Sequence, residues 1–211
     1  MNIIILGWII TNGLSNLFSI CSNNQYIFGG VQGFNMNTRL KKSIENLAPH
    51  YKIKIQIVFW RIDSWNNDYL KVTVDGSIKF SKTYSFYSSL PNLCGATNFN
   101  DEVDYINFEF LHINNKADIE IFVIDNGDND EFWGIQNFEI SLYQCSNNCI
   151  SCNLACLQCK IGYQVINGQC EEYCGDSYAD VEVRIENNFF QILRLQSCYN
   201  QIILQFMREQ S

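Results

Sequence analysis

Two acidic loop segments contain the side chains best suited to holding a cation. One runs from Asp125 to Glu131 and reads Asp-Asn-Gly-Asp-Asn-Asp-Glu, and the other follows a strand-like run and contains Asp63 and Asp68. Calcium takes about six to eight oxygen ligands from carboxylates, amides and backbone carbonyls. The alternative is a pair of solvated turns, because Asp, Asn and Gly are ordinary turn residues. We predict a structural Ca²⁺ site with these ligands: Asp63, Asp68, Asp125, Asp128, Asp130 and Glu131.

Aromatic and amide side chains flank the same loops. Trp65 and Asn66 follow Asp63, and Trp133 follows the second acidic segment. An aromatic face for C–H groups beside polar groups for hydroxyls is the chemistry of sugar binding. Trp65, Asn66 and Trp133 are therefore the predicted ligand-binding residues. Packing in the core is the alternative for the tryptophans.

The sequence lacks the motifs of the common enzyme classes. It has two histidines, His50 and His112, and no Gly-rich nucleotide loop, GxSxG or HExxH. We therefore expect no catalytic residues and no enzyme activity. A glycosidase that uses two loop carboxylates stays open as the alternative, because distant acids can meet in a fold.

Composition limits the partners. Hydrophobic residues make up 47% of the 211 residues, which is enough for a packed core. The 22 acidic and 14 basic side chains give a net charge of -8, which disfavours nucleic acids. No apolar stretch is long enough for a transmembrane span. The expected partner is an extracellular protein or a glycan.

The ten cysteines indicate the compartment. Seven of them lie between Cys145 and Cys174, in a segment poor in core residues, which is typical of a disulfide framework. Two Cys-x2-Cys pairs, at 149–152 and 156–159, also have the spacing of zinc ligands. The first three cysteines of the cluster match the spacing of an iron–sulfur site as well. We favour disulfides, and hence an extracellular or cell-surface location reached by the secretory pathway.

The elements that position these residues are strands. Apolar and polar residues alternate from Gln25 to Tyr143, most clearly over Tyr51–Ile62. Asp75-Gly76 between two alternating runs predicts a tight hairpin. Further strands are expected at 38–44, 103–113, 118–125 and 135–143. The pattern predicts a mainly β protein: an antiparallel, jelly-roll-like β-sandwich followed by a small disulfide-rich module.

The cysteine spacing from 145 to 174, with Gly162-Tyr163 after the second Cys-x2-Cys, resembles the furin-like cysteine-rich repeat of growth factor receptors. Segments 50–53, 59–65 and 130–138 are similar to secreted and surface proteins of ciliates that join a β-sandwich to such repeats; the last also resembles the closing strand of MAM-type adhesion domains. The resemblance implies the pairs Cys145–Cys152, Cys149–Cys156 and Cys159–Cys170, which leaves Cys174 with Cys198 and Cys21 with Cys94.

Four segments are expected. Residues 1–21 are predicted to be a signal peptide, because residues 3–10 form a short apolar run; a buried N-terminal strand is the alternative. The β-sandwich domain spans 22–144, the furin-like module 145–174, and a tail with a short amphipathic helix 175–211. The predicted function is a secreted or cell-surface binding module, stabilised by Ca²⁺ and glycan-binding, on a disulfide-rich stalk. The alternatives are a carbohydrate-active enzyme and a structural extracellular spacer.

Overall fold

A computed structural model describes residues 2–5, 7–85, 91–124, 131–173, 178–185, 189–198 and 201–206, with the backbone alone for 2–5 and from 178 onward. The chain divides between Gln144 and Cys145 into two compact units, at the boundary expected between the sandwich and the cysteine-rich module. Some predicted residues lie outside the described part of the chain: Asp125, Asp128, Asp130, Cys174 and the side chain of Cys198.

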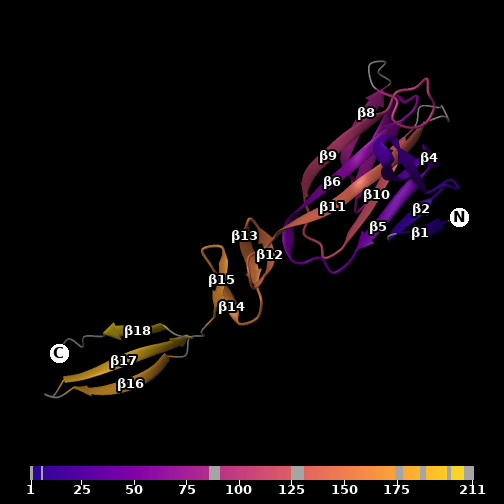
Figure 1. Ribbon diagram of the computed structural model, residues 1–211. Coiled ribbons are helices and arrows are strands. Elements are labelled where there is room, and N and C mark those ends of the chain that lie inside the picture. Colours follow the sequence, from indigo (N-terminus) through magenta and orange to yellow (C-terminus); the bar gives the residue numbers. More distant parts are fainter. Residues whose placement is uncertain are drawn as a thin grey trace. The chain divides into compact units, whose positions relative to one another are not determined.

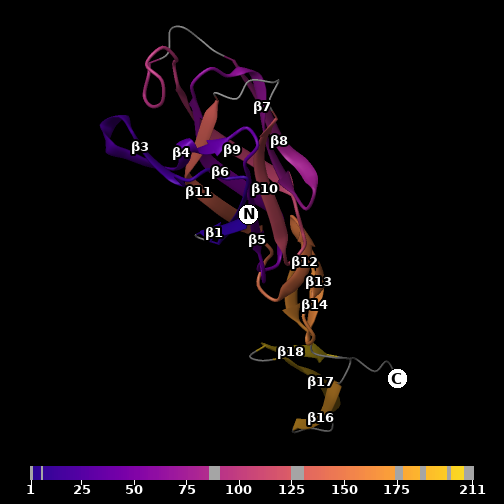
Figure 2. The same ribbon diagram turned by 90° about the vertical axis from the view of Figure 1, so that its right-hand side faces the viewer.

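Within its described residues, the first unit is an antiparallel β-sandwich of two sheets, as predicted (Figures 1 and 2). The six-stranded sheet has the order β1 (Asn2–Ile5), β2 (Trp8–Thr11), β5 (Arg39–Ile44), β10 (Ala117–Ile124), β7 (Asn66–Val74), β8 (Ser77–Ser85). The five-stranded sheet has the order β3 (Phe18–Cys21), β4 (Gln25–Asn35), β11 (Phe132–Gln144), β6 (His50–Ile62), β9 (Glu102–Leu111). A 3-10 helix, η1 (Ser22–Asn24), joins β3 to β4. No helix among the described residues is long and apolar enough to cross a membrane.

The alternation in β6 explains its place at the centre of the five-stranded sheet. Ile53, Ile55 and Ile57 are almost fully buried, because alternate side chains of a strand point to the same face. The turn between β7 and β8 is the predicted hairpin: Asp75 and Gly76 both have positive φ, 51° and 75°. Both central positions of a type I′ turn require this conformation.

The main core lies between the two sheets and contains a cluster of aromatic rings. The ring of Trp133 lies 5.0 Å from Phe34 and 6.1 Å from Phe59, and Phe59 lies 5.7 Å from Trp65. All four side chains are fully buried. These residues come from β4, β11, β6 and the turn before β7, so the cluster ties the two sheets together.

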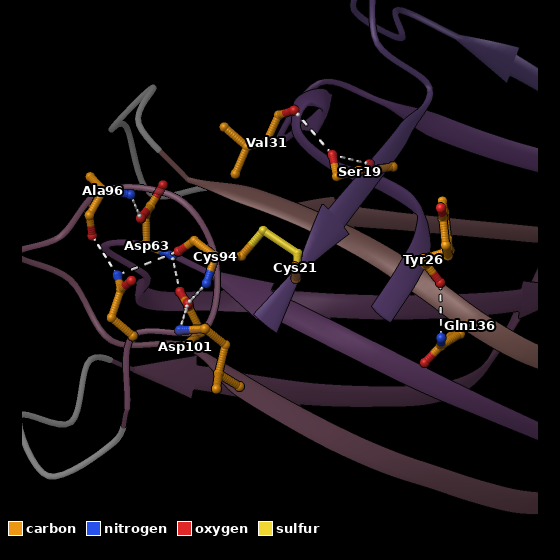
Figure 3. The surroundings of a disulfide bond; sticks show 12 residues. Ser19, Cys21, Tyr26, Val31, Asp63, Cys94, Ala96, Asp101 and Gln136 are labelled. Atoms are coloured by element: carbon orange, nitrogen blue, oxygen red, sulfur yellow. Dashed lines mark hydrogen bonds between the residues drawn. A yellow bond between two sulfur atoms is a disulfide. The ribbon is translucent and has the colours of Figure 1, made fainter. Parts of the chain in front are cut away.

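A second, smaller cluster lies on the outer face of the five-stranded sheet. Trp60 of β6 packs there with Cys21 of β3 and with Leu93 and Cys94 from the loop of residues 91–101. The disulfide between Cys21 and Cys94 holds this loop to β3 across 73 residues of sequence (Figure 3). A cross-link over a long loop removes more entropy from the unfolded chain than one over a short loop. The expected contribution is about 4 kcal/mol.

The described part of residues 1–21 folds with the sandwich, as in the alternative of a buried N-terminal strand, and the signal peptide stays a prediction. This segment contributes β1, β2 and β3, and β2 pairs with β5. Trp8 and Ile10 are 5% and 0% exposed and belong to the main core. Within the described side chains of this segment, residues 8–11 alternate between buried and more exposed positions, as a strand does.

The second unit contains small β-hairpins held by disulfides. Its strands are β12 (Cys149–Asn153), β13 (Ala155–Cys159), β14 (Tyr163–Ile166), β15 (Gln169–Glu172), β16 (Tyr178–Ile185), β17 (Phe189–Cys198) and β18 (Gln201–Phe206). Its disulfides among the described residues are Cys145–Cys152, Cys149–Cys156 and Cys159–Cys170, the pairs that the resemblance implied. These sulfurs are therefore not zinc or iron–sulfur ligands.

The described residues of the tail, 178–185, 189–198 and 201–206, form strands and not the expected helix. Strands β16, β17 and β18 form an antiparallel three-stranded sheet. The segment Val181-Glu182-Val183-Arg184-Ile185 alternates apolar and charged residues, which favours a strand over a helix.

Candidate functional site

The structure contradicts the prediction that Trp65 and Trp133 bind a ligand. Both side chains are fully buried in the main core. The Trp65 indole N–H donates to the carbonyls of Ile62 and Phe132, both at 3.1 Å, and that of Trp133 to Asn35 at 2.8 Å. Their polar groups are satisfied by backbone, so these residues serve packing. Asn66 is exposed, but the buried rings of Trp65 and Trp133 offer no aromatic surface beside it.

The acidic residues near Trp65 organise a loop. Asp101, 1% exposed, accepts hydrogen bonds from the backbone amides of Asp63 and Cys94, at 3.0 and 2.6 Å. Asp63, 3% exposed, accepts one from the amide of Ala96 at 2.8 Å (Figure 3). These carboxylates hold the loop 91–101 against the end of the sandwich.

A buried arginine supports the same loop. The Arg61 guanidinium donates to the carbonyl of Asn100 at 3.0 Å and to that of Asp63 at 3.3 Å. Burial lowers the pKa of Arg61, whereas the negative charges of Glu102 and Asp101 act in the opposite direction. The arginine therefore offsets negative charge at this end of the sandwich.

The described part of the chain does not assemble the predicted cation site. Asp68 is buried and accepts a hydrogen bond from the amide of Asn66 at 2.5 Å; Glu131 is buried just before β11. No three His, Asp or Glu side chains among the described residues bring their ligand atoms within 4.8 Å of one another. The three sulfurs that do so belong to disulfides.

Calcium binding stays a prediction that depends on residues 125–130, which lie outside the described part. A bound ion would raise the free energy of unfolding by about 2.7 kcal/mol at one hundred times its Kd. We predict a higher thermal midpoint in millimolar Ca²⁺ than in EDTA, with Mg²⁺ as the control. Identical midpoints in Ca²⁺ and EDTA would contradict the site.

The two histidines meet in the fold but serve structure. His50 Nε2 and His112 Nδ1 lie 2.8 Å apart, and both rings are buried. His50 Nδ1 donates to the carbonyl of Ala48 at 2.6 Å, and His112 Nε2 lies 3.0 Å from a carboxylate oxygen of Asp75. All four ring nitrogens are engaged within the protein, so the pair links β6 and the end of β9 to the β7–β8 turn.

One edge of the sandwich is closed by contacts between β8 and β9. The rings of Phe80 and Phe108 stack at 5.1 Å, and the ammonium of Lys82 lies 2.6 Å from Asp104. The Tyr84 hydroxyl donates to the same carboxylate at 2.5 Å. Burial, and then this hydrogen bond to Asp104, raise the pKa of Tyr84. These contacts connect β8 to β9 along this edge.

The opposite edge, between β2–β5 and β3–β4, opens into a groove of about 410 Å³. Phe18, Tyr26 and Phe28 form one wall, and the exposed fractions of Phe18 and Tyr26 are 48% and 66%. In the antiparallel register, Phe18 pairs with Phe28, with their rings 5.3 Å apart. Trp8 and Lys42 from the six-stranded sheet form the facing wall.

The floor of the groove is a β-bulge in β11. The register passes from Gln136↔Val58 to Glu139↔Gln56, so that Asn137 and Phe138 together oppose one residue of β6. Asn137 adopts a φ of 50° and is exposed, and Phe138 packs edge-on against Trp8 at 4.9 Å.

Gln136, beside the bulge, donates to the backbone carbonyl of Tyr26 at 2.8 Å (Figure 3). The same amide lies 3.2 Å from Gln25 Oε1. It thereby ties the floor to the aromatic wall.

Sequence reasoning missed this groove. Trp8 and Phe18 lie in the segment predicted to be a signal peptide. Tyr26 lies in β4, which is not among the individually predicted strands. Two signals were present in the sequence. The spacing of three between Ile135 and Phe138 breaks an otherwise regular alternation, and Lys42 occupies a position where that alternation expects an apolar residue.

The fold and the groove define a two-sheet β-sandwich with an aromatic-walled cleft at its open edge, followed by a disulfide-rich module. No family model and no curated protein matches the sequence. Similar solved structures include a family 35 carbohydrate binding module from Clostridium thermocellum (13% identity, 66% of this chain and 97% of that one, TM-score 0.40). A second is CBM35 from Paenibacillus barcinonensis (9% identity, 64% of this chain and 93% of that one, TM-score 0.36). A third is the K1 cleaved adhesin domain of Lys-gingipain from Porphyromonas gingivalis (11% identity, 64% of this chain and 83% of that one, TM-score 0.37). At these values the similarity assigns no ligand and no site to this chain.

Proposed function

We propose that the sandwich is a glycan-binding module and that the groove at its open edge holds the sugar. The observation that carries the proposal is the wall of partly exposed Phe18 and Tyr26 beside the amides of Gln136 and Asn137. Small-ligand sites are apolar and aromatic concavities with a few placed polar groups, and the groove has this composition. An aromatic ring packs on the C–H face of a sugar, while amides bond its hydroxyls.

Binding suits this groove better than hydrolysis does. Its described lining consists of aromatic, aliphatic and amide side chains and Lys42, without a carboxylate or an imidazole. Glycoside hydrolysis generally uses a pair of carboxyl groups flanking the bond that is cleaved. A glycan bound here would meet no such pair.

The disulfides support a site of action outside the cytosol. Cys21–Cys94 in the sandwich and three bonds in the second unit are typical of oxidising compartments. We propose that the protein is secreted or displayed on a cell surface and that its partner is an extracellular glycan.

A glycan array with the intact chain, followed by calorimetric titration of the best oligosaccharide, tests the proposal. Tyr26→Ala should weaken binding at least about tenfold, or ~1.4 kcal/mol, because it removes the more exposed of the two partly exposed rings in the wall. Tyr105→Ala is the matched control: it removes a tyrosine that is 79% exposed on β9, which is separated from the aromatic wall on β3 and β4 by β11 and β6 and does not line the groove, and it should leave the affinity unchanged.

Three results would contradict the proposal: no binding to any glycan, equal affinity for Tyr26→Ala and the unaltered chain, or release of reducing sugar from a bound polysaccharide. The last would favour a carbohydrate-active enzyme.

A further inference from the structure

The facing wall of the groove contains a charge on the core side of a strand. In β5, Leu40 belongs to the main core, and Ile44 packs against it. Lys42 lies between them on the same face, because side chains two apart in a strand share a face. Its neighbours Arg39 and Lys41 point to the other face, where both contact Glu120, at 3.1 and 3.5 Å.

The position of the Lys42 ammonium is defined by its surroundings. It lies 5.3 Å from the centre of the Trp8 ring. It also lies beside the turn at Gly7, where an added β-carbon would come within 3.0 Å of it. The ammonium therefore lies at the mouth of the open edge, and Lys42 is the one charged residue among the ten described residues that line the groove.

A lysine on the core face of a strand is costly unless its charge reaches water or a partner. A hydrocarbon side chain here would extend the core cluster and close the groove further. The lysine instead places a positive charge opposite the aromatic wall of Phe18 and Tyr26. A ligand that spans the groove would have an apolar ring face on one side and a negative group on the other.

We infer that the groove selects acidic glycans, with Lys42 as the residue that recognises a carboxylate on the sugar. This inference rests on the proposed glycan-binding function. A uronic acid is the class that fits best: its carboxylate is attached directly to the sugar ring, so the ring can pack on the aromatic wall while the carboxylate reaches the ammonium. A hydrogen bond between two charged groups is stronger than a neutral one, and salt screens it when exposed.

Titration with trigalacturonate and with its fully methyl-esterified form tests the inference, because the two differ in charge and share the same sugar rings. The unaltered chain should bind the acid at least about tenfold more tightly than the ester at low salt, and the ratio should fall as salt is added.

Lys42→Met keeps the apolar stem and removes the charge. It should bring the acid-to-ester ratio to about one, because the acid then loses the charge contact that the ester does not make. Lys41→Met, the adjacent lysine on the opposite face, is the matched control and should keep the full ratio. Far-ultraviolet circular dichroism and thermal melts establish that each variant is folded before its binding is measured.

An unchanged ratio in Lys42→Met, or equal binding of acid and ester by the unaltered chain, would overturn the inference. Preference for a sulfated oligosaccharide over trigalacturonate would overturn the assignment to a carboxylate. Binding of neutral glycans alone would refute the inference but leave the proposed function standing, whereas absence of all glycan binding would refute both.

Discussion

A chain that begins at Ser22 is expected to lose the cooperative unfolding of the sandwich. The deletion removes β1–β3, including the buried side chains of Trp8 and Ile10 and the disulfide partner of Cys94. Loss of a buried tryptophan and a buried isoleucine costs about 3–5 and 2–5 kcal/mol, and loss of the long-range disulfide costs about 4 kcal/mol. Together these losses are comparable with the roughly 5–15 kcal/mol by which a typical domain is stable.

Urea unfolding followed by tryptophan fluorescence measures this effect. Ile10→Ala in the full chain provides a graded variant, which should lower the free energy of unfolding by about 2–5 kcal/mol while keeping a cooperative transition. A chain starting at Ser22 that unfolds cooperatively at the same urea concentration as the full chain would show that residues 1–21 are dispensable, as a leader is.

The second large effect is expected from Trp133→Ala. Its indole is fully buried against Phe34 and Phe59 and donates to the Asn35 carbonyl. Truncation leaves a cavity and removes a hydrogen bond to the Asn35 carbonyl, which still accepts the amide of Thr38 at 3.0 Å, so the free energy of unfolding should fall by about 3–5 kcal/mol. Chemical denaturation monitored by circular dichroism should show a lower midpoint with an unchanged slope.

Trp133→Phe is the matched control, because it keeps an aromatic ring and loses the indole N–H; it should cost less than the alanine variant. If Trp133 were a binding residue, Trp133→Ala would weaken glycan binding with little loss of stability. That outcome would contradict its place in the core.

The strands of the sandwich could be predicted because their signals are local. The alternation in β6 depends on which face is buried, and Asp75-Gly76 defines its hairpin through two positive φ values. The pairing in the cysteine-rich module was implied by the resemblance to furin-like repeats, and its paired cysteines are 7 to 11 residues apart.

The proposed binding site could not be predicted in the same way, because its parts meet through long-range pairing. Trp65 and Trp133 border polar loops in the sequence, yet carbonyls of other strands satisfy their indoles in the core. Asp63, read as a cation ligand, accepts the amide of Ala96, which lies 33 residues away. The walls of the groove come from β2 and β5 in one sheet and from β3 and β4 in the other, all of which precede residue 45. The floor comes from the bulge of β11, which begins at Phe132, so the groove forms only after this long-range pairing.

Backbone amide chemical shifts, recorded while the oligosaccharide selected on the array is titrated into the intact chain, test the location of the site most directly. The largest changes should lie at Gln136–Phe138 in the bulge, at Tyr26 and Phe28 in β4, and at Lys42 in β5. Changes concentrated instead at residues 63–68 and 91–101, with the groove unaffected, would contradict a groove site and place the ligand at these two segments.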